Sequence, residues 1–187
     1  MREPLKFEEL KTLQTAETVA DAVWRQVTHW KPFERDTVGS QLVRAMDSIG
    51  ANIAEAFGRF HYGEKLQFLY YARGSLFEAK YWLNRASARR LMPPDQVTQH
   101  VTQLTDLARQ LNIFSGGLKT QRRNSAKPAS VTEPAVEYTS ARADDSPLPA
   151  AIQALMALES VAEWSADRDA PLFADDELTW LTTLPNP

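Results

Sequence analysis

The chain has 187 residues, of which 43% are hydrophobic, and its 21 Lys and Arg against 24 Asp and Glu give a formal net charge of −3. This composition is enough for a buried core, while the absence of cysteine excludes disulfides, thiolate metal sites and cysteine nucleophiles. No apolar run is long enough to span a membrane, and the N-terminal sequence MREPLKFEELKTLQ has no apolar secretion signal. We therefore expect a cytoplasmic protein with no membrane association.

Four amphipathic helices are predicted in the first 125 residues. Apolar residues recur there at steps of three and four, the spacing of a helix with one buried face. The predicted helices cover residues 7–30, 33–58, 64–92 and 95–116, and the last is expected to end at Gly116-Gly117. The predicted helices are joined by connections of only a few residues, and short connections favour helices that pack antiparallel to their neighbours in sequence. The sequence therefore predicts an all-α fold, an up-down-up-down four-helix bundle over residues 1–125.

Three glycines fall inside the predicted helices. Gly39, Gly50 and Gly74 each cost about 1 kcal/mol relative to alanine unless the missing side chain permits a close approach. We expect such an approach at Gly74, in the segment ARGSLFEA. Gly39 is equally consistent with a tolerated surface position.

Composition and charge change together near Asn124–Pro128. Residues 1–125 contain 18 Lys and Arg against 13 Asp and Glu, a net +5, whereas residues 126–187 contain 3 against 11, a net −8. Residues 126–147 have the composition of a flexible linker. We expect residues 148–187 to form a largely flexible, acidic and amphipathic tail. Its candidate partner-docking residues are Leu155, Trp164, Phe173, Trp180 and Leu181.

Three interpretations of this tail remain open. It folds back on the basic head of its own chain as an electrostatic cover, or it docks into a groove on a partner protein, as acidic amphipathic segments do. A tail without a binding role is the third alternative.

Polar residues occupy one face of the second predicted helix. Ser48, Asn52, Glu55 and Arg59 follow each other at steps of four, three and four, and Glu55 with Arg59 forms a favourable i,i+4 pair. In the third helix, Arg73 falls in register with the apolar stripe, so its guanidinium requires a carboxylate. We expect Glu55 as that partner and Glu78 as the second choice. We interpret these six residues as a structural polar network that holds helices or subunits in register; a solvated face with one local ion pair is the alternative.

Two segments of the chain resemble a known family. SIGANIAEAFGR at residues 48–59 and FLYYARGSLFEAKYWL at residues 68–83 are similar to the signature pair of a bacterial four-helix-bundle family, named after proteins encoded in intervening sequences of large-subunit ribosomal RNA genes. The resemblance covers roughly residues 5–121. By it, the signature positions are Asn52, Glu55, Arg59, Arg73, Gly74, Ser75 and Glu78.

The resemblance also implies an assembly and partners. The related accessory variability proteins of diversity-generating retroelements form pentameric barrels whose basic surfaces engage a reverse transcriptase and nucleic acid. This chain departs from the family at Gly50, where proline is usual, and at Ala56, where glycine is frequent. Its acidic tail has no counterpart in a typical short member.

Catalysis and metal binding are not expected. The three histidines, His29, His61 and His100, lack the spacing of metal ligands. Ser75 has no neighbouring base to activate it. We therefore predict a protein that is not an enzyme and holds no cofactor.

Two basic clusters are candidate phosphate contacts. Arg85, Arg89 and Arg90 lie near the end of the third predicted helix, and Lys119, Arg122 and Arg123 lie beyond the fourth. Basic residues near helix C-termini are also favoured by the helix dipole alone, so both explanations remain open. In an oligomeric ring, each cluster would be repeated around a rim and would attract phosphate.

We therefore expect a homo-oligomeric accessory protein, a pentamer by the resemblance, that binds RNA, DNA or a ribonucleoprotein with a reverse transcriptase. The alternative is a scaffold that recruits an effector enzyme through its C-terminal tail. A small-molecule sensor that uses the bundle interior is a third possibility.

Overall fold

The structure is a computed structural model and describes residues 7–125 and 170–184. Throughout these two ranges the regular structure is helical and there is no strand, as the sequence predicts. The long helices are α1 (Lys11–Val27), α3 (Ser40–Gly58), α4 (Tyr62–Ala88) and α5 (Pro94–Ser125). The short elements are a 3₁₀ turn η1 (Phe7–Glu9), α2 (Pro32–Glu34), a π-helical turn η2 (Arg35–Gly39) and α8 (Asp175–Thr182).

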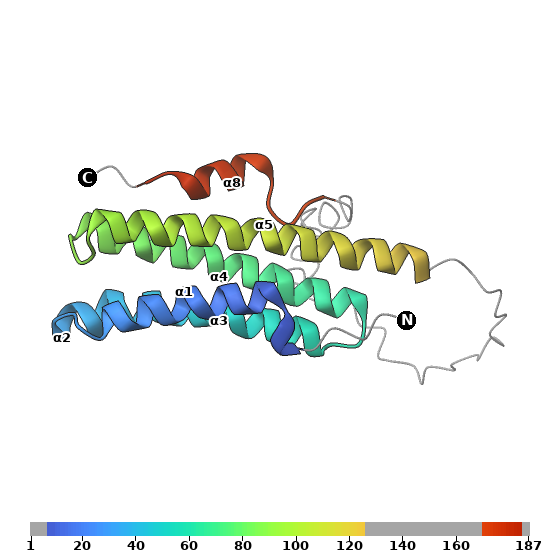
Figure 1. Cartoon of the computed structure of the whole chain (residues 1–187), viewed down its shortest axis with the longest axis horizontal. Coiled ribbons are helices and arrows are strands. Elements are labelled where there is room, and N and C mark those ends of the chain that lie inside the picture. Colours follow the sequence, from blue (N-terminus) through green and yellow to red (C-terminus); the bar gives the residue numbers. More distant parts are fainter. Residues whose placement is uncertain (1–6, 126–169, 185–187) are drawn as a thin grey trace, which may run out of the picture. The chain divides into compact units, whose positions relative to one another are not determined.

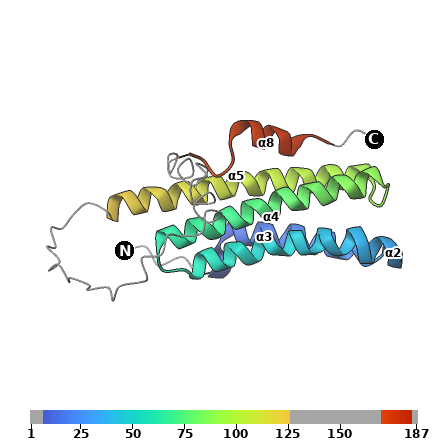
Figure 2. The ribbon, with the colours of Figure 1, turned by 180° about the vertical axis from the view of Figure 1, so that it is seen from behind.

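The long helices form a helical bundle. Figures 1 and 2 show α1, α3, α4 and α5 side by side, with successive helices running in opposite directions. Their apolar faces share one core, in which Val23, Ile49, Leu76 and Leu104 are completely buried. Burial of such side chains contributes about 1.5–3 kcal/mol each. The predicted apolar stripes are therefore the surfaces that hold the helices together.

The last long helix runs further than its sequence indicates. α5 continues to Ser125, so the predicted end at Gly116-Gly117 is wrong. Both glycines are exposed, and Leu118, directly after them, is buried in the core. Burial of Leu118 contributes about 1.5–3 kcal/mol, which offsets the helix penalty of about 2 kcal/mol for the two glycines.

Residues near the C-terminus belong to the bundle unit. The chain up to Arg123 and the chain from Pro171 onward form one compact unit. Leu172, Phe173 and Leu181 are buried in the core cluster of the bundle. The predicted linker at residues 126–147 and the docking residues Leu155 and Trp164 lie outside the described residues. No helix of the described ranges combines the length and apolar character needed to cross a membrane.

Gly39 marks a close approach between chain segments, and Gly74 does not. A Cβ atom added at Gly39 would lie 2.6 Å from Cγ1 of Val27 and 3.4 Å from Cε3 of Trp30. At Gly74 the same atom would meet nothing within 4 Å in the described parts of the chain. The expectation of close packing at Gly74 is therefore wrong, and the missing side chain is needed at Gly39 instead.

Substitution of these two glycines by alanine should have opposite effects. Gly39→Ala should lower the free energy of unfolding by about 1–3 kcal/mol because the new methyl group overlaps Val27. Gly74→Ala should raise it by about 1 kcal/mol because alanine favours the helix and meets no obstacle. Urea unfolding followed by circular dichroism measures both, and a stabilised Gly39→Ala variant would contradict the packing described here.

Candidate functional site

Part of the predicted polar network joins α3 to α4. The hydroxyl oxygens of Ser48 and Ser75 lie 2.9 Å apart. Asn52 Nδ2 donates to the Ser48 carbonyl oxygen at 2.8 Å and to its hydroxyl oxygen at 3.2 Å. These half-buried contacts connect two helices, so this part of the polar face has a structural role.

The other part of the polar face is a surface ion pair. Arg59 pairs with Glu55, and both side chains are nearly half exposed, at 41% and 47%. The Arg59 guanidinium also lies 4.7 Å from the centre of the Phe68 ring. An exposed pair of this kind contributes less than about 1 kcal/mol.

The prediction that Arg73 pairs with Glu55 is wrong. Arg73 forms an ion pair with Glu177 of α8, and their side chains are 31% and 28% exposed. Its guanidinium lies 4.8 Å from the Phe77 ring centre and 5.6 Å from that of Phe173. The expected second choice, Glu78, instead accepts a long hydrogen bond from Trp82 Nε1 at 3.4 Å. The acidic segment near the C-terminus supplies the carboxylate that the guanidinium requires.

A second cation of α4 is covered by the same segment. Lys80 is completely buried, and its ammonium donates hydrogen bonds to Asn84 Oδ1 at 3.0 Å and to the carbonyl oxygen of Thr183. It lies 5.9 Å from the ring centre of Trp180. Burial lowers the pKa of the Lys80 side chain to about 8. Lys80 is not among the residues predicted from the sequence, although its place seven residues after Arg73 puts both cations on one helix face.

Asn112 of α5 binds the backbone of the C-terminal segment. Its Nδ2 donates to the carbonyl oxygen of Phe173 at 2.8 Å, and its Oδ1 accepts from the Phe173 N–H at 2.7 Å. The Phe77 ring stacks on the rings of Phe173 and Trp180, at centroid distances of 5.9 and 5.3 Å. We call Arg73, Phe77, Lys80 and Asn112 the α4–α5 surface, and residues 171–184 the C-terminal segment.

Three of the candidate partner-docking residues therefore contact their own chain. Phe173 and Leu181 are buried, and Trp180 stacks on Phe77 with 42% of its surface exposed. This arrangement agrees with the interpretation in which the tail folds back on its own basic head. Docking of the tail onto another protein stays a prediction.

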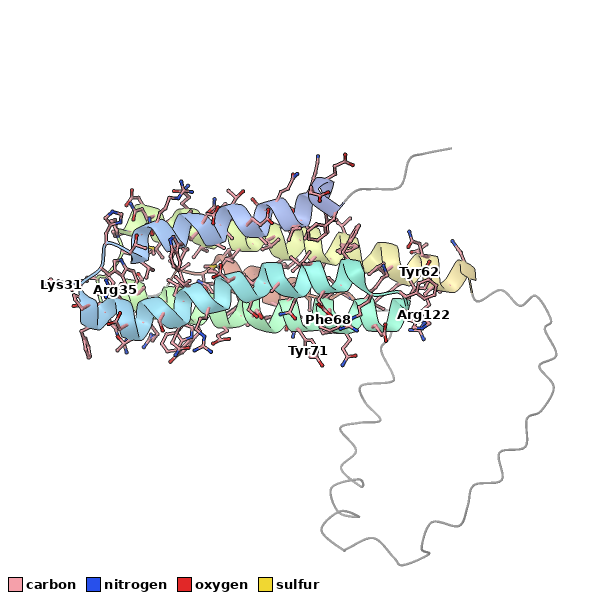
Figure 3. All side chains as sticks on the ribbon, turned by 90° about the horizontal axis from the view of Figure 1, so that it is seen from below. Lys31, Arg35, Tyr62, Phe68, Tyr71 and Arg122 are labelled. Carbon is pink, nitrogen blue, oxygen red and sulfur yellow. The ribbon has the colours of Figure 1, made fainter. Side chains whose placement is uncertain are left out.

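Exposed arginines lie at both ends of the bundle. Figure 3 shows Lys31 and Arg35 at the end that carries α2, whereas Arg122 lies near Tyr62 at the opposite end. α4 ends at the α2 end of the bundle, so Arg85, Arg89 and Arg90 lie there too. Lys31 and Arg35 are not among the phosphate contacts predicted from the sequence. Both lie in the connection between α1 and α3, and this shared position could have identified them.

Most of the predicted phosphate contacts have accessible charges. Within residues 7–125 and 170–184, no carboxylate forms an ion pair with Arg85, Arg89, Arg90, Arg122 or Arg123. All five are exposed. Lys119 differs because only 9% of it is exposed, so it is poorly placed to contact phosphate.

Arg90 has a backbone conformation that usually requires glycine. Its φ of 54° is the only positive value among the described non-glycine residues. It follows the last turn of α4, where the Arg90 N–H bonds to the Ser87 carbonyl oxygen and the Leu91 N–H to that of Ala86, both at 2.9 Å. This is the Schellman motif, whose left-handed residue is normally glycine. A residue with a Cβ atom at this left-handed position costs about 1–2 kcal/mol relative to glycine.

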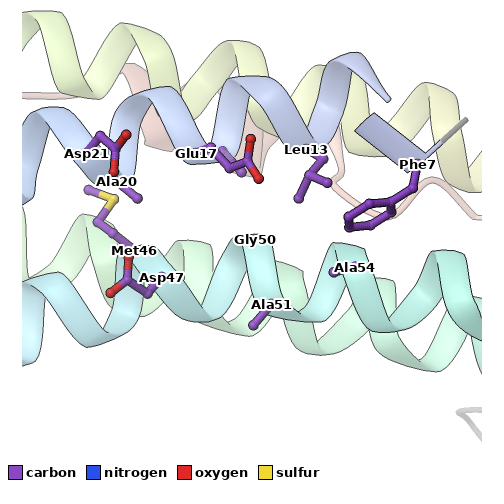
Figure 4. A pocket seen from close by; sticks show the side chains of 11 residues that line it. Phe7, Leu13, Glu17, Ala20, Asp21, Met46, Asp47, Gly50, Ala51 and Ala54 are labelled. Carbon is purple, nitrogen blue, oxygen red and sulfur yellow. The ribbon is translucent and has the colours of Figure 1, made fainter. Parts of the chain in front are cut away.

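A cleft of about 500 Å³ lies between α1 and α3 (Figure 4). Leu13, Met46 and Gly50 are among its apolar lining residues, and its charged groups are all acidic, namely Glu17, Asp21 and Asp47. Partial burial, together with the neighbouring Asp21 carboxylate, raises the pKa of Asp47. Such a cleft repels phosphate, so nucleic acid is not expected to bind there.

The histidines do not converge on a common site in the described residues. Nδ1 of His29 lies 2.6 Å from the Arg25 carbonyl oxygen, while buried His100 contacts Gln26 and Gln103 at 3.2 and 3.1 Å. Within these same ranges, no three His, Asp or Glu residues are placed to hold a metal ion.

These features define a class, that of all-helical bundle proteins whose central helices are joined by polar contacts between two signature segments. The chain belongs to the 23S rRNA-intervening sequence protein family, whose model matches residues 8–113. The match confirms the resemblance of the two segments, and it leaves out the C-terminal segment. The family description states no enzymatic activity. A search of curated proteins finds no match to the chain.

The buried Lys80 should make stability rise with pH. Its pKa is lowered from 10.5 to about 8 in the folded protein. Between these two values the folded protein has lost a proton that the unfolded chain still binds, so raising the pH favours folding, by up to about 3 kcal/mol. Urea unfolding at a series of pH values measures this rise. Lys80→Met should reduce the rise, and an unchanged pH dependence in that variant would contradict the assignment.

Proposed function

We propose that this chain is a non-enzymatic, homo-oligomeric accessory protein that binds nucleic acid, or a ribonucleoprotein containing a reverse transcriptase, in the cytoplasm. Its subunit is an up-down-up-down four-helix bundle, and exposed arginines at the bundle ends contact phosphate. One observation carries the proposal: Arg90 occupies a left-handed position next to exposed Arg89. A contact of Arg90 outside the subunit would explain why a long charged side chain stands at a position where glycine costs less.

The arrangement of the other charges supports this proposal. Residues 1–125 have a net charge of +5, and the charged residues of the α1–α3 cleft are all acidic. The exposed arginines that lack a carboxylate partner in the described residues lie at the bundle ends. If the assembly is pentameric, as the family resemblance implies, each end would present five copies of its arginines around a rim. Such a ring attracts phosphate at low salt.

A second candidate function is recruitment of a partner enzyme. The C-terminal segment keeps part of its apolar surface accessible, because Trp180 is 42% and Leu184 50% exposed. A scaffold would use this outer face for binding. Since Phe173 and Leu181 are buried against the bundle, we place this function second.

Removal of one end arginine should weaken nucleic-acid binding in a salt-dependent way. We expect the affinity of the full-length protein for a fluorescein-labelled single-stranded RNA or a DNA duplex to fall steeply between about 50 and 200 mM salt. Arg89→Ala should lower the slope of log K against log[salt] by about 1. Fluorescence anisotropy measures the binding, and light scattering on the same samples gives the size of the assembly.

The matched control is Arg109→Ala. Arg109 is an exposed arginine of α5 that pairs with Asp106 at 2.8 Å, so both variants lose one positive charge. Equal loss of binding in the two variants would show a general charge effect rather than a site. Binding that does not respond to salt would overturn the proposal.

Arg90→Gly should separate stability from binding. Glycine tolerates the left-handed backbone, so the free energy of unfolding should rise by about 1 kcal/mol, while phosphate binding weakens. Arg89→Gly is the control, because Arg89 has an ordinary φ of −94° and should gain no stability. Urea unfolding and the anisotropy assay measure the two effects, and unchanged RNA affinity in Arg90→Gly would remove Arg90 from the interface.

A further inference from the structure

The two cations of the α4–α5 surface contact opposite ends of α8. Arg73 binds Glu177 in the first turn of α8, and Lys80 binds the carbonyl oxygen of Thr183 directly after the last turn. Acidic groups are favoured at a helix N-terminus and cations at a helix C-terminus. The spacings agree, since seven residues of α4 and six residues of α8 span about 10 and 9 Å. The two cations therefore suit a helix parallel to α4 (Figure 1).

The contacts of Asn112 indicate which kind of molecule, the occupant, fits the α4–α5 surface. Its amide donates to the carbonyl oxygen of Phe173 and accepts from the N–H of the same residue. Paired donor and acceptor groups of this kind belong to an extended peptide backbone and have no counterpart in a phosphate group. The surface is therefore built for a peptide, although two of its side chains are cations.

The apolar contacts define the sequence that fits. Leu172, Phe173 and Leu181 of the segment are buried, and Phe77 of α4 stacks on the rings of Phe173 and Trp180. The occupant is thus a short helix with an acidic first turn, preceded by a leucine and a phenylalanine. Its last turn carries an aromatic and an aliphatic side chain.

The connection between α5 and the C-terminal segment permits exchange between copies. Residues 126–169 separate the two described ranges, and a chain of that length reaches up to about 150 Å when extended. Connectivity alone therefore does not restrict the segment to its own bundle. A second copy of the chain carries the same segment, with the same acidic turn and the same apolar residues.

We propose that the α4–α5 surface is a peptide-recognition site, and that it also binds the C-terminal segment of a second copy, so that exchanged segments link subunits. Exchange is favoured whenever copies are held close together, because the local concentration of segments then rises. The site is separate from the arginines of the bundle ends. Its existence does not depend on nucleic-acid binding.

Two full-length variants test the exchange. In the acceptor, Phe173→Ala and Leu181→Ala disable the segment and leave the α4–α5 surface intact. In the donor, Arg73→Ala and Asn112→Ala disable the surface and leave the segment intact. The donor also carries Leu184→Cys, which provides a unique site for a fluorescent dye because the natural chain has no cysteine. Circular dichroism checks that both variants retain their helical content.

We expect the anisotropy of the labelled donor to rise on titration with the acceptor. An acceptor that also carries Asn112→Ala should bind at least tenfold more weakly, since two hydrogen bonds are lost. An acceptor with Arg109→Ala should bind as before. This comparison separates the exchange from any other subunit interface, because all acceptors share that interface.

A synthetic peptide of residues 170–184 is the second probe. It should bind the acceptor and displace the donor. If the donor binds equally well to acceptors with and without Asn112→Ala, the peptide site is overturned. If the acceptor binds the peptide but not the donor, the exchange is overturned. The acceptor should retain its affinity for RNA, so failure of this inference is distinguishable from failure of the proposed function.

Discussion

The cost of removing two cations from water determines how the C-terminal segment is placed. Arg73 is about two-thirds buried and Lys80 is completely buried, and a buried charge without a partner costs several kcal/mol. The segment supplies a carboxylate for Arg73 and a carbonyl oxygen for Lys80. Around these two contacts, the stacked rings and the Asn112 amide complete the interface. Hydrophobic burial provides attraction, while the polar contacts fix position and direction.

Residues within the family match therefore serve two different purposes in this chain. Ser48, Asn52 and Ser75 join α3 to α4 within the matched residues 8–113. Arg73 also lies within the matched residues, yet it binds Glu177, which lies outside the match. The internal contact belongs to the bundle itself. The second contact connects the bundle to a segment that the family model leaves out.

The α1–α3 cleft, the bundle ends and the α4–α5 surface differ in charge, so each favours a different kind of ligand. The charged residues that line the α1–α3 cleft are acidic. At the bundle ends, five exposed arginines have no carboxylate partner within the described residues, namely Arg85, Arg89, Arg90, Arg122 and Arg123. The cations of the α4–α5 surface already have partners in the C-terminal segment, namely Glu177 for Arg73 and the Thr183 carbonyl oxygen for Lys80. In our proposal, nucleic acid binds at the ends because these five arginines are exposed and free to contact phosphate. In the same proposal, the α4–α5 surface binds the C-terminal segment of its own chain or of a second copy.

The sequence by itself determined the helices and the family, because apolar periodicity and a signature pair are local properties of the chain. It also determined the i,i+4 pair of Glu55 and Arg59, whose partners lie one turn apart. Only the tertiary structure decided which glycine needs its missing side chain and how far α5 extends, because both depend on packing. The partner of Arg73 lies 104 residues away, and the burial of Lys80 depends on the same distant segment. No periodicity within a helix specifies such a contact, because it arises only when the folded bundle brings the two segments together.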